Sequence, residues 1–157
     1  FNPQDSTVSG KRAVLESGIG ELEQGLLSLS EELGVTKPLI DTAITAMGAG
    51  AGSAAAFTFV SKILYGHPVG SGIHNGPSSW PWLKQYKKKN RTAYKSCDVA
   101  SSLIVQVLGA DYILYGPIGS APQVFPIVAM GEVFAAEAAK QEFGLEPVAG
   151  HPFTKLL

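Results

Sequence analysis

Three short apolar segments recur along the chain, and each is followed by a longer segment with helical periodicity. The apolar segments cover residues 39–45, 69–73 and 112–115. Strands that are joined through helices lie parallel in a sheet, and such crossovers are right-handed. The pattern therefore predicts an α/β fold with parallel strands alternating with helices.

Helices are predicted where apolar residues repeat at helical intervals. Three glycines (Gly18, Gly20 and Gly25) are expected to split the first of them. The predicted helices cover residues 11–33, 53–65, 78–89, 92–108 and 122–143. In the fourth helix we expect one face to be buried, made of Val99, Leu103, Ile104 and Val107.

Glycines and polar side chains mark the ends of the predicted strands. The second strand runs into Gly72, His74 and Asn75, and the other two lead into Gly48 and Gly119. Glycine lets a ligand approach the backbone, and the sites of β/α barrels lie at the carboxyl ends of the strands. We therefore expect the functional site at this edge of the sheet.

The strands fit either an open doubly wound sheet or part of a (β/α)8 TIM barrel. A complete barrel needs about 250 residues, whereas the sequence has 157. It begins without methionine, and residues 1–5 (FNPQD) resemble the end of a strand that passes into a loop. We expect residues 1–157 to form a single partial domain, the C-terminal portion of a longer barrel protein.

Composition and charge narrow the classes of function. Hydrophobic residues make up 45% of the chain, and 12 basic against 13 acidic residues give a net charge of −1, which favours neither nucleic-acid binding nor a membrane surface. The single cysteine, Cys97, is expected to be buried and fits a cytoplasmic protein. The most apolar stretch, residues 54–60, is followed by Ser61 and Lys62, so no membrane-spanning segment is predicted.

Asp41, His74 and Asn75 are the candidate site residues. A carboxylate within an apolar strand needs a partner, so Asp41 either accepts from a neighbouring backbone or lysine group, or binds the N–H groups of a ligand. Asn75 either caps the turn before Pro77 or contacts a heterocycle, because its amide both donates and accepts. For His74 a structural hydrogen bond competes with a catalytic role.

Two further segments carry weaker signals. Residues 48–53 (GAGAGS) resemble a phosphate-binding loop but lack its Lys-Ser/Thr ending, so tight turning is the alternative. A run of cations is either a solvated helix face or a docking surface for an acidic partner protein. It comprises Lys84, Lys87, Lys88, Lys89, Arg91 and Lys95. The histidines and the cysteine show no metal-ligand spacing, and no metal site is predicted.

Taken together, several motifs resemble the H subunit of the tetrahydromethanopterin S-methyltransferase family over essentially the whole chain. They are residues 38–45 (PLIDTAIT), 47–52 (MGAGAG), 68–75 (PVGSGIHN), 111–118 (DYILYGPI) and 151–157 (HPFTKLL). Residues 1–5 resemble a loop in the middle of that family's chain. The resemblance places this chain in the C-terminal half of such a protein.

The resemblance implies a pterin-binding barrel that moves the N5-methyl group of methyl-tetrahydromethanopterin to the cob(I)amide of a corrinoid protein. The related methyltetrahydrofolate–corrinoid methyltransferases use an Asp at a strand end and a Gly-x-x-Asn element, which match Asp41 and Gly72–Asn75 here. Asp41, Gly72, His74 and Asn75 would then bind the pterin. Asn75 would also be catalytic, donating a hydrogen bond to N5.

The implied partners are a corrinoid-binding subunit and other subunits of a methyltransferase complex in methanogenesis. We expect a cytoplasmic homo-oligomer that is peripheral on a membrane complex. Two alternatives stay open. One is a bacterial-type methyltransferase that uses methyltetrahydrofolate in a methylamine or betaine pathway, and the other is a non-catalytic scaffold subunit.

Overall fold

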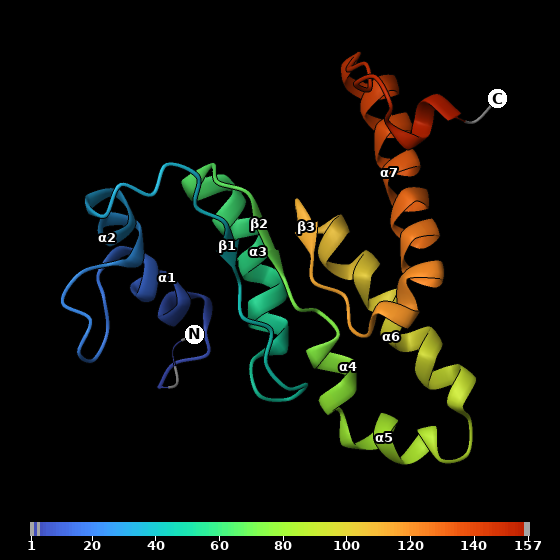
Figure 1. Cartoon of the computed structure of the whole chain (residues 1–157), viewed down its shortest axis with the longest axis horizontal. Coiled ribbons are helices and arrows are strands. Elements are labelled where there is room, and N and C mark those ends of the chain that lie inside the picture. The colour runs from blue at the N-terminus through green and yellow to red at the C-terminus, as the bar shows by residue number, and fades with distance from the viewer. Residues whose placement is uncertain (1, 3, 156–157) are drawn as a thin grey trace.

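Three short parallel strands form the centre of the fold (Figure 1). They are β1 (Ile40–Asp41), β2 (Val69–Ser71) and β3 (Tyr112–Ile113), arranged in that order. Asp41 lies opposite Gly70, which in turn lies opposite Tyr112. This computed structural model describes residues 2 and 4–155. Parts of the predicted opening loop (Phe1, Pro3) and tail (Leu156, Leu157) lie outside the described residues.

Helices connect and flank the strands. They are α1 (Val8–Glu16), α2 (Leu26–Glu32), α3 (Ala51–Tyr65), α4 (Asn75–Ser79), α5 (Pro81–Lys87), α6 (Arg91–Val107) and α7 (Ala121–Phe143), with 3-10 turns η1 (Ile118–Ser120) and η2 (Pro152–Lys155). The predicted split of the first helix is confirmed. The helix predicted from Ser78 or Ser79 begins instead at Pro81, because Asn75–Ser79 forms a short helix of its own and Trp80 is the N-cap of α5.

Both crossover helices cover the same face of the sheet. Ala54 of α3 and Val105 of α6 are fully buried in one cluster with Ile44 and Ile73. The other face stays open, and Leu114, next to β3, is 55% exposed there. Strands added in sequence order with helices on one face follow the winding of a barrel. The structure confirms the α/β class with a small parallel sheet, but it shows no closed barrel.

The buried face of α6 differs from the prediction. Its buried side chains are Val99, Ser101, Ser102 and Val105. In contrast, Ile104 is 52% exposed and Val107 is 78% exposed. Small serine side chains face inward because α6 packs closely against its neighbours. Cys97, expected to be buried, is exposed.

A long apolar segment was missed by the sequence analysis. Ile118–Phe143 is 26 residues long and, by length and composition alone, apolar enough to cross a membrane; core helices also pass this test. Only 11% of its most apolar 18-residue stretch is buried.

Tight turning explains the glycine-rich loop before α3, because Gly48 and Gly50 have φ values of +86° and +101°.

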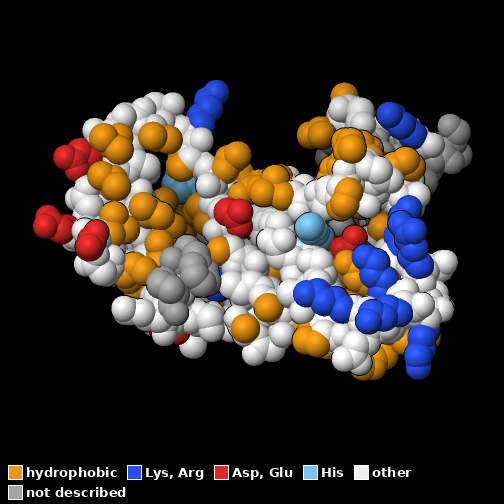
Figure 2. All heavy atoms as spheres, turned by 60° about the horizontal axis from the view of Figure 1, so that its bottom comes forward, with side chains coloured by type: hydrophobic (Ala, Val, Ile, Leu, Met, Phe, Trp, Pro, Cys, Tyr) orange, Lys and Arg blue, Asp and Glu red, His pale blue; other side chains and the backbone are white. Residues whose placement is uncertain are grey.

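Charged side chains are unevenly distributed over the face that Figure 2 shows. Figure 2 shows lysine and arginine side chains gathered on the side of the molecule that holds α5 and the start of α6. Acidic side chains gather toward the opposite end, where α1 and α2 lie (Figure 2). The residues of the predicted cationic run are all exposed.

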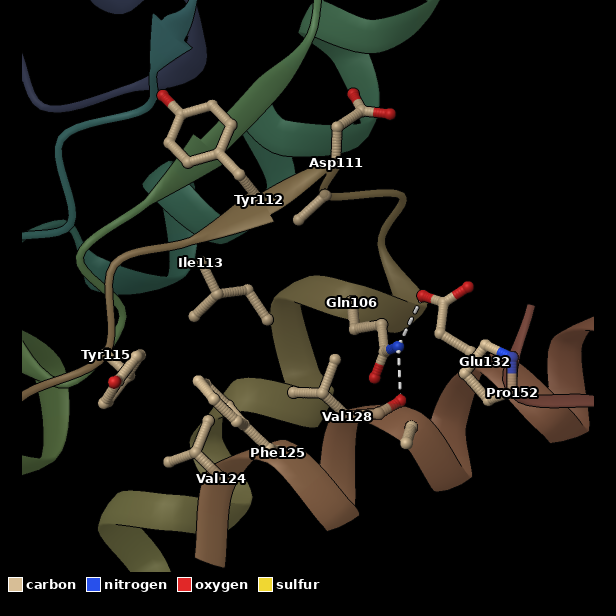
Figure 3. A pocket seen from close by; sticks show the side chains of 12 residues that line it. Gln106, Asp111, Tyr112, Ile113, Tyr115, Val124, Phe125, Val128, Glu132 and Pro152 are labelled. Atoms are coloured by element: carbon tan, nitrogen blue, oxygen red, sulfur yellow. Dashed lines mark hydrogen bonds between the residues drawn. The ribbon is translucent and has the colours of Figure 1, made fainter. Parts of the chain in front are cut away.

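A mainly apolar cavity of about 340 Å³ lies beside the outer edge of β3, between α6 and α7 (Figure 3). Ile113, Phe125 and Val128 point into it (Figure 3). At its rim, Gln106 Nε2 donates to the carbonyl of Val128 at 2.9 Å and to Glu132 Oε1 at 2.7 Å. The free edge of β3 and the exposed apolar side of α7 are thus uncovered in this chain.

Candidate functional site

Asp41 lies at the carboxyl end of β1, with its side chain exposed rather than enclosed in a strand core. Its Oδ1 accepts a hydrogen bond from the N–H of Ala43 at 2.7 Å. Ala43 adopts a φ of +54°, which a residue with a Cβ rarely takes. Of the two interpretations of Asp41, the structure shows the backbone partner, and the exposed carboxylate can also face a ligand.

Lys11, which the sequence analysis missed, holds the end of β1 through the backbone carbonyls that follow Asp41. It projects from α1, is only 5% exposed, and donates from Nζ to the carbonyls of Thr42 at 2.9 Å and Ala43 at 3.3 Å. Burial lowers the pKa of Lys11, and the charge of Asp41 partly opposes that effect. No sequence signal distinguishes this lysine from an ordinary surface lysine on an amphipathic helix.

Tyr112 is a second residue that the sequence analysis missed. Its hydroxyl donates to the carbonyl of Ile40 at 3.0 Å, so its ring crosses β2 to reach β1. The ring can lie there because Gly70 has no side chain; a Cβ on Gly70 would collide with Tyr112. Burial raises the pKa of Tyr112, and the negative charge of Asp41 adds to the rise. This hydrogen bond fixes the three strands relative to one another beneath Asp41.

The predicted Gly-x-x-Asn element forms a tight turn after β2. The N–H of Asn75 donates to the carbonyl of Gly72 at 3.1 Å, and the amide side chain of Asn75 folds back over Gly72. A Cβ on Gly72 would lie 3.3 Å from Asn75 Nδ2, so glycine gives the amide its room. Asn75 is exposed at the start of α4, and no hydrogen bond of its side chain occurs among the described residues.

His74 lies between the ends of β2 and β3. Its ring packs on Gly116, where a Cβ would lie 2.8 Å from Nδ1. The side chain makes no hydrogen bond within residues 2 and 4–155, so the structural hydrogen bond that was one alternative for His74 is not found among them. The ring therefore forms a wall of the site with its nitrogens available.

All four predicted site residues come together in one open cavity of about 370 Å³. Its lining consists of Asp41, Ala43, Ile44, Gly72, His74, Asn75, Leu114, Tyr115 and Gly116. The cavity lies at the carboxyl ends of the strands, where ligands of such sheets bind. A carboxylate acceptor, an amide and an imidazole around apolar side chains suit a flat heterocycle with several N–H groups. In the part of the chain that the structure describes, no cluster of three metal-ligating side chains was found.

Comparison with known proteins identifies the family. A model of the tetrahydromethanopterin S-methyltransferase MtrH subunit matches residues 1–148. The H subunit of tetrahydromethanopterin S-methyltransferase from Methanothermobacter thermautotrophicus is 51% identical over 157 residues, covering 100% of this chain and 50% of that protein. The corresponding protein of Methanocaldococcus jannaschii is 46% identical over 166 residues, covering 100% of this chain and 52% of the relative.

A relative with a different name aligns over the same length. The H subunit of the putative methyltransferase mtx from Methanosarcina barkeri is 46% identical over 157 residues, covering 100% of this chain and 50% of that protein. This chain belongs to the MtrH family of tetrahydromethanopterin S-methyltransferase subunits. It spans about half the length of the curated relatives that it matches.

Proposed function

We propose that this chain is part of a methyltransferase subunit that takes the N5-methyl group from methyl-tetrahydromethanopterin. The observation that carries the proposal is the cavity that joins Asp41, Gly72, His74 and Asn75 at the carboxyl edge of the sheet in a member of this family. In the reaction, the Co(I) of a corrinoid held by a partner protein would take the methyl group as a cation and become methyl-Co(III). The electron pair of the broken C–N5 bond stays on N5, which takes up a proton from water.

Asp41 and Asn75 take different roles in this proposal. The exposed carboxylate of Asp41 accepts from the N–H groups of the pterin ring and fixes the orientation of the ring. The amide of Asn75 donates to N5, where negative charge builds as the methyl group leaves, so this hydrogen bond strengthens in the transition state. The Asn75 side chain has no competing hydrogen bond among the described residues and can make this contact without breaking another.

Lys11 is a positioning residue in the same proposal. It binds the carbonyls of the two residues that follow Asp41 and holds Ala43 at its positive φ. The backbone of Ala43 in turn orients Asp41 through the hydrogen bond to Oδ1. The ligand contact of the carboxylate therefore depends on a lysine that need not touch the ligand.

For the full-length protein we propose a closed (β/α)8 barrel. The sheet has helices on one face, an open second face and a free edge at β3. Relatives of twice this length can supply the remaining strands. A strand from that part of the protein would pair with β3, next to the apolar cavity beside α7 (Figure 3). The open face would then become the barrel interior.

The proposed setting is a multi-subunit complex. The corrinoid belongs to a separate polypeptide, so the mouth of the cavity has to stay open to a large partner. The exposed positions of Asp41 and Asn75 are consistent with this requirement. We further propose a cytoplasmic location, association of the subunit into a homo-oligomer, and peripheral attachment to a membrane complex.

Replacing Asn75 tests the proposal. In the full-length protein, the loss of cob(I)alamin absorbance is followed after adding methyl-tetrahydromethanopterin or, separately, methyltetrahydrofolate. We expect Asn75→Ala to lower the transfer rate by about 10²–10³-fold, as for the loss of one transition-state donor. Gln85→Ala, which removes an exposed amide on α5, serves as the matched control and should react like the wild type.

The outcomes are distinct. Wild-type turnover in Asn75→Ala would remove Asn75 from the mechanism. If the wild type shows no reaction with either pterin, using free cob(I)alamin or a protein-bound corrinoid, the proposed activity is wrong. A faster reaction with one of the two pterins identifies the physiological donor.

A further inference from the structure

Besides the candidate pterin site, a second cavity lies at the same edge of the sheet, with a volume of about 640 Å³. It is formed by the ends of α4 and α5, the first turns of α6 and the segment around η1. Its polar lining includes His74, Ser78, Lys87, Arg91, Lys95 and Asp98. Nothing in the reaction proposed above uses this cavity.

The second cavity has an excess of positive charge. Arg91 and Lys95 lie one turn apart at the start of α6, and Lys87 comes from the last turn of α5. Lys87 Nζ lies 4.1 Å from the centre of the Tyr94 ring, which holds the ammonium group over the aromatic face. Among the described residues these three cations take part in no ion pair within 4.0 Å, and Asp98 is the only carboxylate in the lining. The cations belong to the basic patch of Figure 2.

Asp98 supplies the second cavity with a hydrogen-bond acceptor. Its Oδ1 is buried and has no hydrogen-bond partner among the described residues. A buried acceptor without a partner is costly, so a donor that reaches the Asp98 carboxylate from the cavity would be favoured. A hydroxyl group can donate to Asp98 while an anionic group on the same ligand meets the cations.

His74 lines both cavities, so they adjoin at this side chain. A ligand whose ring lies against Asp41 and Asn75 would have to pass His74 to reach the cations on α6. The concave shape and the buried acceptor favour a small flexible chain over the broad surface of an acidic protein.

We propose that the second cavity binds the tail of the pterin substrate, an extension that carries hydroxyl groups and a phosphate or carboxylate. The proposal rests on the proposed function, because the ring of the same molecule occupies the neighbouring cavity. The tail site would select among pterins that share one ring system but differ in the chemistry of the tail.

The test compares two pterins in the full-length protein. One probe is tetrahydromethanopterin, whose ring carries a long phosphate-bearing tail, and the other is 6-methyltetrahydropterin, which has the ring alone. Dissociation constants are measured by calorimetry for the wild type, Arg91→Gln, Lys95→Gln and the control Lys88→Gln. Lys88 lies in the same cationic run but does not line the cavity.

We expect Arg91→Gln and Lys95→Gln each to weaken binding of the tailed pterin by about three- to tenfold, since each removes one exposed charge-assisted contact. Binding of the ring alone should stay unchanged in both variants, and Lys88→Gln should bind both probes like the wild type. Millimolar inorganic phosphate should weaken binding of the tailed pterin only.

Three results would overturn the tail site. The first is wild-type affinity of both variants for the tailed pterin. The second is equal weakening for both probes, which would indicate a general structural effect. The third is unchanged pterin binding with slower transfer to a protein-bound corrinoid only, which would make the patch a docking surface. Failure of the wild type to bind either pterin would instead refute the proposed function, and the tail site with it.

Discussion

Replacing Lys11 by methionine should show how the site depends on a buried lysine. The substitution keeps an apolar stem of similar length but removes the ammonium group that donates to the carbonyls of Thr42 at 2.9 Å and Ala43 at 3.3 Å. Those carbonyls lie at a strand end where Ala43 has a positive φ. Without the donor, the strained turn loses the contact that compensates for it.

The size of the effect follows from two opposing contributions. A hydrogen bond from a charged donor contributes about 1.5–3 kcal/mol, and the longer contact to Ala43 adds little. Removing the buried ammonium also relieves the desolvation that lowers the pKa of Lys11. We expect a net loss of about 2 kcal/mol in the free energy of unfolding, or about 3 °C in melting temperature for a full-length protein about twice this length.

The assay combines thermal melting of the full-length protein with pterin binding. Lys37→Met, at an exposed lysine shortly before β1, is the matched control and should leave both unchanged. Lys11→Met should in addition weaken pterin binding, because Asp41 loses its fixed orientation. A variant that melts like the wild type and binds pterin normally would refute the role assigned to Lys11.

Two further predictions concern neighbouring parts of the fold. Gly116→Ala adds a methyl group whose carbon lies 2.8 Å from His74 Nδ1. It should displace that ring and slow methyl transfer by about tenfold to hundredfold with little change in melting temperature. Gly52→Ala, where a Cβ meets nothing within 4 Å, is its control, and equal rates in the two variants would contradict the placement of His74. Asp111 accepts from the N–H of Val69 at 3.0 Å and pairs with Lys62. Burial alone would raise the pKa of Asp111, but these two hydrogen bonds and the charge of Lys62 outweigh it and lower the pKa below 3.8. The stability that this carboxylate contributes is therefore present above pH 3.8 and is lost as the pH falls through the lowered pKa. The free energy of unfolding, measured with urea at several pH values, should fall less over that acidic range in Asp111→Asn than in the wild type. An equal dependence on pH in the two proteins would refute the stabilising role of the Asp111 carboxylate.

Much of the candidate site could be predicted because its residues come directly at or after the ends of strands. Gly72 and Asn75 are close in sequence, and their turn is local. Asp41 lies on the neighbouring strand, and parallel pairing brings its carboxyl end to the same edge. The alternation of strands and helices, the polar residues at the strand ends and the family resemblance together were enough to predict these side chains at one edge of the sheet.

The buried face of α6 was predicted only in part, because Val99 is buried as expected but Ile104 and Val107 are exposed. The predicted burial of Cys97 was wrong. Periodicity identifies an apolar stripe but does not say how closely a helix approaches its neighbours. Ser102 is buried at close approach, whereas Ile104 remains exposed. The missed apolar stretch over Ile118–Phe143 has the same cause, since α7 contains core-like residues that this chain leaves uncovered.

The sequence by itself determined the alternation of strands and helices, the parallel sheet and the edge at which the polar residues gather, because these depend on local periodicity and on short turns. Only the tertiary structure decided that Lys11 holds the end of β1, that Tyr112 crosses Gly70 to reach Ile40, and that His74 lies between two neighbouring cavities. These contacts join residues far apart along the chain, and their geometry depends on how helices and strands pack in space, which no local pattern contains.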